Sequence, residues 1–363
     1  MMAWQALQPG SSYPSYPTQP GRKPSIACPS TSIMSIEDTC EKRNEQMITE
    51  RTGRRQWNRI ADVAAIGVAI GFIAFLTQHP TAGFDLWGAY APAASGDVSN
   101  IYNPYWALPL FELLGKVPFG LAYSALMLWS LVAIIVSTQV YGGRLVFALL
   151  TYQFGTLLYF GQIDGLVVLG MATSWWALKN HRPWLVGIGF VLASIKPQMS
   201  VAALLLIWWW LDRPGKIRSL AIPFLVILGS FLLYGCWVPE WLNRVQTQDP
   251  VRGGSITLWE YFGPIVLLLW LPALLTRLPR QEKLLLFLAT SAITMPYFQQ
   301  VSLLVLQVFP IGWIAWIGNI GFLHPMFHEQ ILEWIVLLPL SVYIWLVWTG
   351  IHRSHRGRPQ PSG

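Results

Sequence analysis

Three short polar segments lie beside apolar runs of the sequence, and their side chains could carry out chemistry. Asp85 lies in "HPTAGFDLWGAY", Gln162 and Asp164 lie in "YFGQIDGLV", and Lys196 and Gln198 lie in "SIKPQM". A carboxylate can take a proton from a hydroxyl as that hydroxyl attacks. A lysine at a proline-broken helix start, next to backbone N–H groups with no helical partner, favours a bound phosphate. The residue types therefore suggest a general base and an anion site.

Each of these residues also has a structural interpretation. Lys196 is equally compatible with a lysine that reaches the lipid headgroup layer. Taken alone, Asp85 is more often a solvated loop acid, and Gln162 and Asp164 are more often turn residues. In the functional interpretation, Gln162 and Asp164 hydrogen bond a sugar or orient a phosphate. Asp97, which follows Ser and Gly, is typical of a turn.

The composition predicts the scaffold that must position these groups. Hydrophobic residues make up 54% of the 363 residues and charged residues only 11%, whereas a soluble domain carries about 25% charged residues. Apolar runs of about 18 to 22 residues recur along the chain. Twenty tryptophans fit a membrane protein, because Trp collects at membrane–water interfaces. We expect an all-α, polytopic transmembrane protein with about 10–12 spans.

Apolar periodicity and length place the spans, and the basic residues orient them. The expected spans are 60–77, 119–140, 144–160, 163–179, 184–196, 199–211, 218–237, 256–276, 283–296, 301–320 and 331–350. The net charge of +7 lies largely in short loops between spans, which indicates a positive-inside bias rather than a nucleic-acid partner. This bias puts the N-terminus in the cytoplasm and the three polar segments on the outer face. The alternation fails after the last span. Either one span is miscounted near 297–330, where Pro310 interrupts the run, or the C-terminal tail breaks the rule.

The chain divides into three regions. Residues 1–56 are rich in Pro, Ser and Gly and are expected to be disordered; Met47 is a plausible alternative start. Residues 57–350 form a single transmembrane domain, and residues 351–363 form a basic tail. The three cysteines indicate neither a disulfide framework nor a metal site, and the histidines form no metal constellation. We therefore expect no metal and no cofactor.

The order of the motifs resembles the polytopic C-superfamily (GT-C) glycosyltransferases that use polyprenyl-phosphate sugars. Within them the chain looks most like glycosyltransferase family 87, which includes mycobacterial mannosyltransferases. The similar stretches are "FDLWGAYAPAASGDVSNIYNPYWALPLF", "YFGQIDGLVVLGMA" and "GIGFVLASIKPQMSVAALLLIWW", and together they cover about residues 80–206. One departure is the segment "NPYWALPLFELLGKVP", where many members carry a longer "yPP" stretch.

The resemblance implies a polyprenyl-phosphate sugar as donor, a reaction on the outer face, and an acidic residue of the first outer loop as base. Asp85 occupies that position, and Lys196 occupies the position of the family's lysine–proline motif. The expected donor-binding residues are Lys196, Gln198, Gln162, Asp164, Tyr102 and Asn103. A hexose, with mannose favoured by analogy, would pass with inversion to a lipid or polymer acceptor.

Two other functions remain open at this point. A polyprenyl-lipid transporter or flippase could use the same phosphate site, although no internal symmetry of discontinuous helices is visible in the sequence. A non-catalytic membrane subunit of surface polysaccharide assembly is the other alternative. In all three cases the expected location is the cell membrane, with several spans and with membrane lipids as neighbours.

Overall fold

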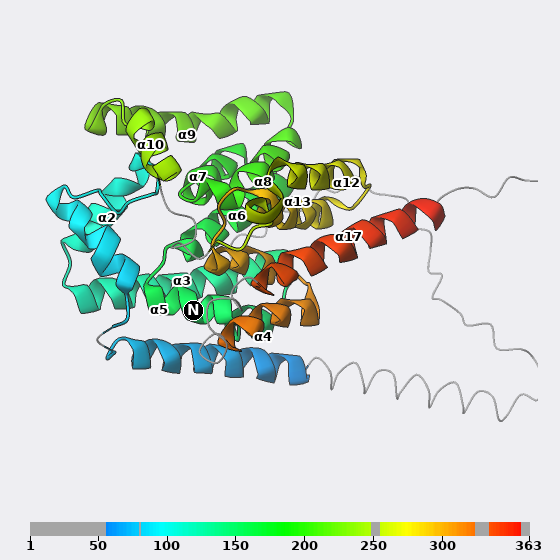
Figure 1. Cartoon of the computed structure of the whole chain (residues 1–363), viewed down its shortest axis with the longest axis horizontal. Helices are drawn as coiled ribbons and strands as arrows, with labels where there is room; N and C mark the ends of the chain where they lie inside the picture. The colour runs from blue at the N-terminus through cyan, green and yellow to red at the C-terminus, as the bar shows by residue number, and fades with distance from the viewer. Residues whose placement is uncertain (1–55, 80, 248–254, 324–333, 357–363) are drawn as a thin grey trace, which may run out of the picture. The chain divides into compact units, whose positions relative to one another are not determined.

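The computed structural model describes residues 56–79, 81–247, 255–323 and 334–356 (Figure 1). Ile60–Gly363 form one compact unit, to which the following description applies. The expected N-terminal tail, except for residue 56, and the end of the basic C-terminal tail lie outside the described residues. Within the described ranges every regular element is a helix, and an isolated antiparallel bridge joins Ser255 to Gln299.

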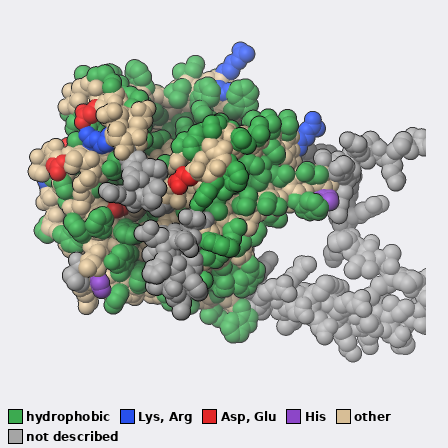
Figure 2. Space-filling model, viewed as in Figure 1, with side chains coloured by type: hydrophobic (Ala, Val, Ile, Leu, Met, Phe, Trp, Pro, Cys, Tyr) green, Lys and Arg blue, Asp and Glu red, His purple; other side chains and the backbone are tan. Residues whose placement is uncertain are grey.

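Among the residues that the structure describes, four helices are long and apolar enough to cross a membrane. They are Gln56–Leu76, α3 (Phe119–Tyr141), α9 (Arg213–Tyr234) and the stretch Trp334–Arg353, most of which belongs to α17 (Leu337–Arg356). Shorter apolar helices accompany them, and hydrophobic side chains cover much of the surface seen in Figure 2. The expected all-α, polytopic membrane protein is therefore confirmed.

Three of the expected continuous spans are interrupted. Run 144–160 divides into α4 (Leu145–Leu149) and α5 (Tyr152–Phe160). The other two runs also consist of short helices, namely α11 (Trp259–Phe262), η4 (Gly263–Leu269) and α12 (Trp270–Leu275), and then η5 (Gln300–Leu303), α14 (Leu304–Gln307) and η6 (Gly312–Leu323). The last interruption contains Pro310, which cannot continue a helical hydrogen-bond ladder.

Two side chains hydrogen bond to the backbone groups that the break between α4 and α5 leaves without helical partners. The Asn319 side chain accepts a hydrogen bond from Tyr152 N at 2.9 Å and donates one to Leu150 O at 3.2 Å. Thr151 Oγ1 accepts from Phe154 N at 3.3 Å and so caps α5. Backbone groups that a broken helix leaves unpaired must find such partners in an apolar environment.

The segment expected as the long outer loop contains several short helices. They are η1 (Leu86–Tyr90), η2 (Ala91–Ser95), η3 (Tyr105–Ala107) and α2 (Leu108–Gly115). Helix α10 (Val238–Thr247) lies at the same end of the molecule, toward the left of Figure 1. In Figure 2 acidic side chains are visible at this end. We refer to it as the α2/α10 end.

A tight helical hairpin brings two of the polar segments together. Helix α6 (Asp164–Lys179) leads away from the α2/α10 end, α7 (Pro183–Ala193) returns to it, and α8 (Pro197–Trp209) leaves again. A Cβ at Gly170 of α6 would lie 2.5 Å from Ala193 N and 2.7 Å from Gly189 O of α7. Only small residues permit this approach. The start of α6 and the residues after α7 therefore lie side by side.

Candidate active site

A polar cavity of about 570 Å³ opens at the α2/α10 end. Segments that are far apart in the sequence contribute to its wall. Its lining residues are Phe84, Asp85, Gly88, Ala89, Tyr90, Asn100, Tyr102, Asn103, Lys196, Gln198, Thr247, Tyr297 and Gln299. The cavity thus combines a carboxylate, an ammonium group and several amide and hydroxyl groups.

Lys196 lies at the back of this cavity in a buried ion pair. Its side chain is 7% exposed, and its Nζ lies 2.6 Å from Oδ2 of Asp164, whose side chain is fully buried. The same ammonium group donates to Gln162 Oε1 at 2.7 Å and to Gln299 Oε1 at 3.0 Å. A buried charge is tolerated only when it is paired and hydrogen bonded, and these three acceptors meet that requirement.

Asp164 is itself held from two directions. Ser302 Oγ donates to its Oδ1 at 2.7 Å, so that both carboxylate oxygens have partners. Asp164 is also the first residue of α6, where the helix dipole stabilises a negative charge. The carboxylate therefore serves as a fixed counter-ion behind Lys196 and does not line the cavity.

Asp85 is a second, differently placed carboxylate. It is half-buried, directly precedes η1 and lines the cavity. Burial is the main cause that raises its pKa; the positive charge of Lys196 lowers it, the charge of Asp164 raises it and a hydrogen bond from Gln162 lowers it. The result is a pKa of about 6, above the ordinary 3.8. This carboxylate can accept a proton near neutral pH, as a general base must.

Gln162 connects these charged groups. Its Oε1 accepts from Lys196, and its side chain also hydrogen bonds to Asp85. It occupies the turn between α5 and α6, where Gly161 adopts a positive φ of 70°. From that turn Gln162 contacts both the ion pair and the second carboxylate.

The segment 98–105 forms another part of the cavity wall. Asn103 Nδ2 donates to Ile195 O at 2.9 Å, which ties this segment to the residue before Lys196. Tyr102 is 38% exposed, and its backbone oxygen accepts from Trp241 Nε1 of α10 at 2.9 Å. Tyr102 therefore presents an exposed ring at the cavity, whereas Asn103 is buried and anchors the segment.

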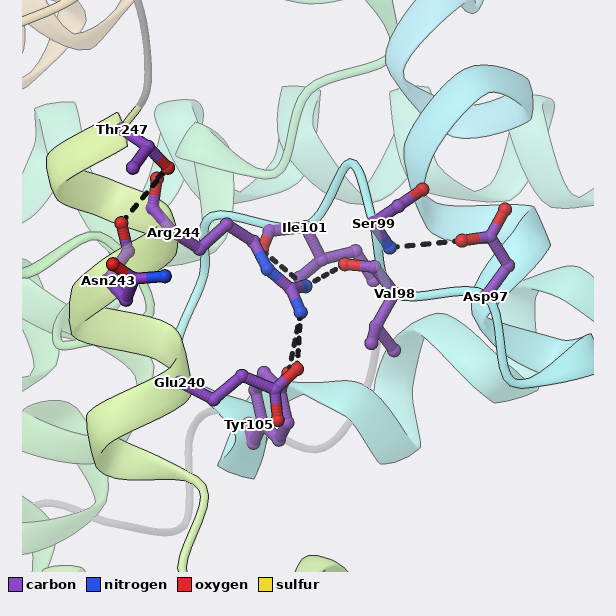
Figure 3. Close-up of polar contacts among 9 residues, drawn as sticks. All are labelled: Asp97, Val98, Ser99, Ile101, Tyr105, Glu240, Asn243, Arg244 and Thr247. Carbon is purple, nitrogen blue, oxygen red and sulfur yellow. Dashed lines mark hydrogen bonds and ion pairs between the residues drawn. The ribbon is translucent and has the colours of Figure 1, made fainter.

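Arg244 of α10 fastens the same segment, as Figure 3 shows. Its guanidinium donates to the backbone oxygens of Val98 and Ile101. It also donates to the Tyr105 hydroxyl at 3.1 Å and pairs with Glu240 at 2.6 Å. A guanidinium can serve several acceptors at once because its five donors form a rigid fork. Helix α10 thus fixes one wall of the cavity.

The structure brings together most of the residues that the sequence singled out. Asp85, Lys196, Gln198, Tyr102 and Asn103 line one cavity. Gln162 and Asp164 lie directly behind it, bonded to Lys196 rather than to the open space. Their expected contact with a sugar or a phosphate stays a prediction.

Sequence reasoning missed Gln299, Ser302 and Tyr297. Gln299 and Tyr297 line the cavity, and Ser302 bonds Asp164. Tyr297 and Gln299 belong to "MPYFQQ", a polar interruption between two apolar runs, and Ser302 follows it. Nothing in that stretch indicates that its residues meet Lys196.

A second cavity, of about 410 Å³, is almost wholly apolar. Its lining residues come from α7, α8, α9 and η3 and are Trp106, Phe190, Val191, Ser194, Val201, Leu204, Leu205, Trp208, Leu220, Pro223, Val226 and Ile227. We call it the apolar groove. It runs beside α8, the helix that begins directly after Lys196.

Among the described residues, no group of three or more His, Cys, Asp or Glu side chains is placed to hold a metal ion. The positive charge that the cavity offers comes from Lys196. Arg244 of α10 points its guanidinium at the segment 98–105 (Figure 3).

The fold and this site define a polytopic membrane protein with a half-buried polar cavity at one end of its bundle. The model of glycosyltransferase family 87 matches residues 100–317, which is more than half of the chain. The chain therefore belongs to glycosyltransferase family 87 and is a membrane glycosyltransferase. Neither a search of curated proteins nor a search of solved structures gives a match.

The family match includes most of the site but not all of it. It contains Gln162, Asp164, Lys196 and Gln299, whereas Asp85 precedes its first residue. The case for Asp85 therefore depends on its position in the cavity and on its raised pKa.

The buried ion pair leads to a stability prediction. Asp164→Asn removes the counter-ion of a buried ammonium group, and we expect a loss of about 3–5 kcal/mol in the free energy of unfolding. The double variant Asp164→Asn/Lys196→Gln leaves no unpaired charge and should recover most of that loss. Chemical denaturation of the purified protein in detergent measures both values.

The pair between Arg353 and Glu282 provides the control. Their atoms are 2.6 Å apart, but the side chains are 50% and 29% exposed, so Glu282→Gln should cost less than about 1 kcal/mol. Equal losses for Asp164→Asn and Glu282→Gln would show that the buried pair has no special role.

Proposed function

We propose that this glycosyltransferase transfers a hexose, with mannose as the first candidate, from a polyprenyl-phosphate sugar to a hydroxyl of a lipid or polymer acceptor. The reaction takes place at the outer face of the cell membrane. The observation that carries the proposal is that Asp85 and Lys196 line one cavity in a member of a glycosyltransferase family. The choice of face rests on the Lys and Arg distribution in the short loops.

The roles of the two charged groups follow from the chemistry. Asp85 takes the proton from the acceptor hydroxyl, and the oxygen attacks the anomeric carbon opposite the phosphate. The bond from that carbon to the phosphate oxygen breaks, polyprenyl phosphate leaves and the anomeric configuration inverts. Lys196 and the N-terminus of α8 stabilise the charge that grows on the departing phosphate. No separate strong acid is needed, because a phosphate is already a good leaving group.

The apolar groove supports a lipid-linked donor. Its walls are side chains of α7, α8 and α9, and the phosphate-binding lysine directly precedes α8. A polyprenyl chain in this groove would keep its methylene and methyl groups out of water, while its phosphate reaches the polar cavity. A donor with a phosphate sugar and an apolar chain thus agrees with a protein that has both a cavity with polar groups and an apolar groove.

Substitution of the proposed base tests the function. Asp85→Asn keeps the shape of the side chain but cannot accept the proton, so we expect the transfer rate to fall about 10²- to 10⁴-fold. Binding of decaprenyl phosphate should stay within about threefold, because Asp85 does not hold the phosphate. Transfer is measured with radiolabelled decaprenyl-phosphate mannose and a membrane lipid extract as acceptor, followed by separation of labelled lipids and polymers.

Asp97→Asn is the matched control. Asp97 belongs to the same segment but is exposed, accepts a hydrogen bond from Ser99 N and does not line the cavity. Its substitution should leave the rate unchanged. If Asp85→Asn transfers sugar at the wild-type rate, Asp85 is not the base. Movement of decaprenyl phosphate across vesicles without any sugar transfer would favour a transporter instead.

The pKa of Asp85 leads to a pH prediction. A base works only when deprotonated, so kcat/KM should fall about tenfold per pH unit below about pH 6 and level off above it. The residual activity of Asp85→Asn should lack this acidic limb. The measurement is kcat/KM between pH 4.5 and 8 in detergent, with folding checked at each pH by circular dichroism. A wild-type profile that is flat through pH 6 would contradict the assignment.

A further inference from the structure

The ammonium group of Lys196 has no spare hydrogen-bond donor in the structure. A lysine carries three N–H donors and no acceptor. Three acceptors surround its Nζ, namely Gln162 Oε1 at 2.7 Å, Asp164 Oδ2 at 2.6 Å and Gln299 Oε1 at 3.0 Å. A phosphate oxygen can therefore bond to Lys196 only if one of these acceptors leaves.

The three acceptors are not equally replaceable. Asp164 is fully buried, carries a charge and is held by Ser302. Gln162 is 6% exposed, and the backbone turn before α6 fixes it, with Gln162 N bonded to Leu157 O at 3.1 Å. Gln299 is partly buried, uncharged, lines the cavity and makes the longest of the three bonds. It is the acceptor that a ligand in the cavity reaches first.

The Gln299 side chain can leave without disturbing the fold. Its backbone is fixed by the bridge to Ser255, by Ile256 N bonding to Phe298 O at 3.0 Å and by Ser302 N bonding to Gln299 O at 3.0 Å. Rotation about side-chain bonds alone would open one donor of Lys196. The exchange is favourable because a charged phosphate oxygen accepts a stronger hydrogen bond from an ammonium group than a neutral amide does.

We propose that the Gln299 side chain is a displaceable hydrogen-bond partner of Lys196. When the donor binds, its phosphate takes the place of this side chain. Gln299 is thus a positioning residue: it keeps the buried ammonium group satisfied while the site is empty and gives up its place to a phosphate ester. This inference rests on the proposed function, since it takes the ligand to be a lipid phosphate.

Two substitutions of the same residue should act in opposite directions. Gln299→Ala removes the competing acceptor, so the dissociation constant for decaprenyl phosphate should fall about three- to tenfold. Gln299→Glu puts a carboxylate against Lys196, which holds the lysine and repels the phosphate, so the constant should rise at least about tenfold. Binding is measured on the full-length protein in nanodiscs with fluorescent decaprenyl phosphate, and the stability of each variant is followed by thermal unfolding.

Neighbouring variants and a second ligand sharpen the test. Gln300→Ala and Gln300→Glu change the adjacent glutamine, which does not line the cavity, and should alter affinity less than about twofold. Gln299→Met, similar in length but without the amide, should behave like Gln299→Ala.

Inorganic phosphate as competitor separates recognition of the phosphate from recognition of the lipid. Displacement of decaprenyl phosphate at millimolar concentration indicates that the phosphate alone is recognised, and no displacement indicates that the lipid chain is required.

The contrary outcomes are distinct. If Gln299→Ala weakens binding as much as Lys196→Ala does, Gln299 is a direct phosphate ligand and the displacement is wrong. If both Gln299 variants leave affinity unchanged, the phosphate does not bind at Lys196. If the wild-type protein binds no decaprenyl phosphate, the proposed donor class fails and the displacement fails with it. The first outcome leaves the proposed function intact, and the second removes the role of Lys196 from it.

Discussion

A buried ion pair organises the site of this membrane glycosyltransferase. Lys196 and Asp164 lie 2.6 Å apart with almost no exposure, in a protein whose surroundings penalise any unpaired charge. Several neighbouring side chains satisfy that pair. The hydrogen bonds of the pair are completed by Gln162, Gln299 and Ser302. The Gln162 side chain also hydrogen bonds to Asp85. Asp85 lines the cavity and has a pKa raised to about 6, so this carboxylate is placed to exchange a proton with a ligand.

Close helix packing makes the pair possible. Gly170 and Gly189 let α6 and α7 approach so closely that a Cβ at Gly170 would meet backbone atoms of α7. The helix that begins with Asp164 is thereby placed beside the segment that ends at Lys196. On the other side, Arg244 of α10 holds the wall that contains Tyr102 and Asn103. The hairpin of α6 and α7 thus positions the two charges, and the segment 98–105, which Arg244 holds, supplies part of the polar lining.

The sequence predicts the parts of this arrangement that depend on local composition. The apolar runs indicate a helical membrane protein, and Asp85, Lys196 and Gln198 stand out as polar residues that adjoin such runs. The rest depends on contacts between distant positions. Gln299 meets Lys196 across 103 positions and Ser302 meets Asp164 across 138, and neither is marked by its own segment. The break before α5 likewise requires Asn319, 169 positions from Leu150, so no pattern within 144–160 reveals it.

The most direct test of the account is a cryo-electron microscopy structure of the protein in nanodiscs with decaprenyl phosphate bound. We expect a phosphate oxygen within about 2.9 Å of Lys196 Nζ, with the lipid chain in the apolar groove and the Asp85 carboxylate facing the same cavity as the phosphate. A phosphate bound elsewhere, with all three native acceptors still on Lys196, would contradict it.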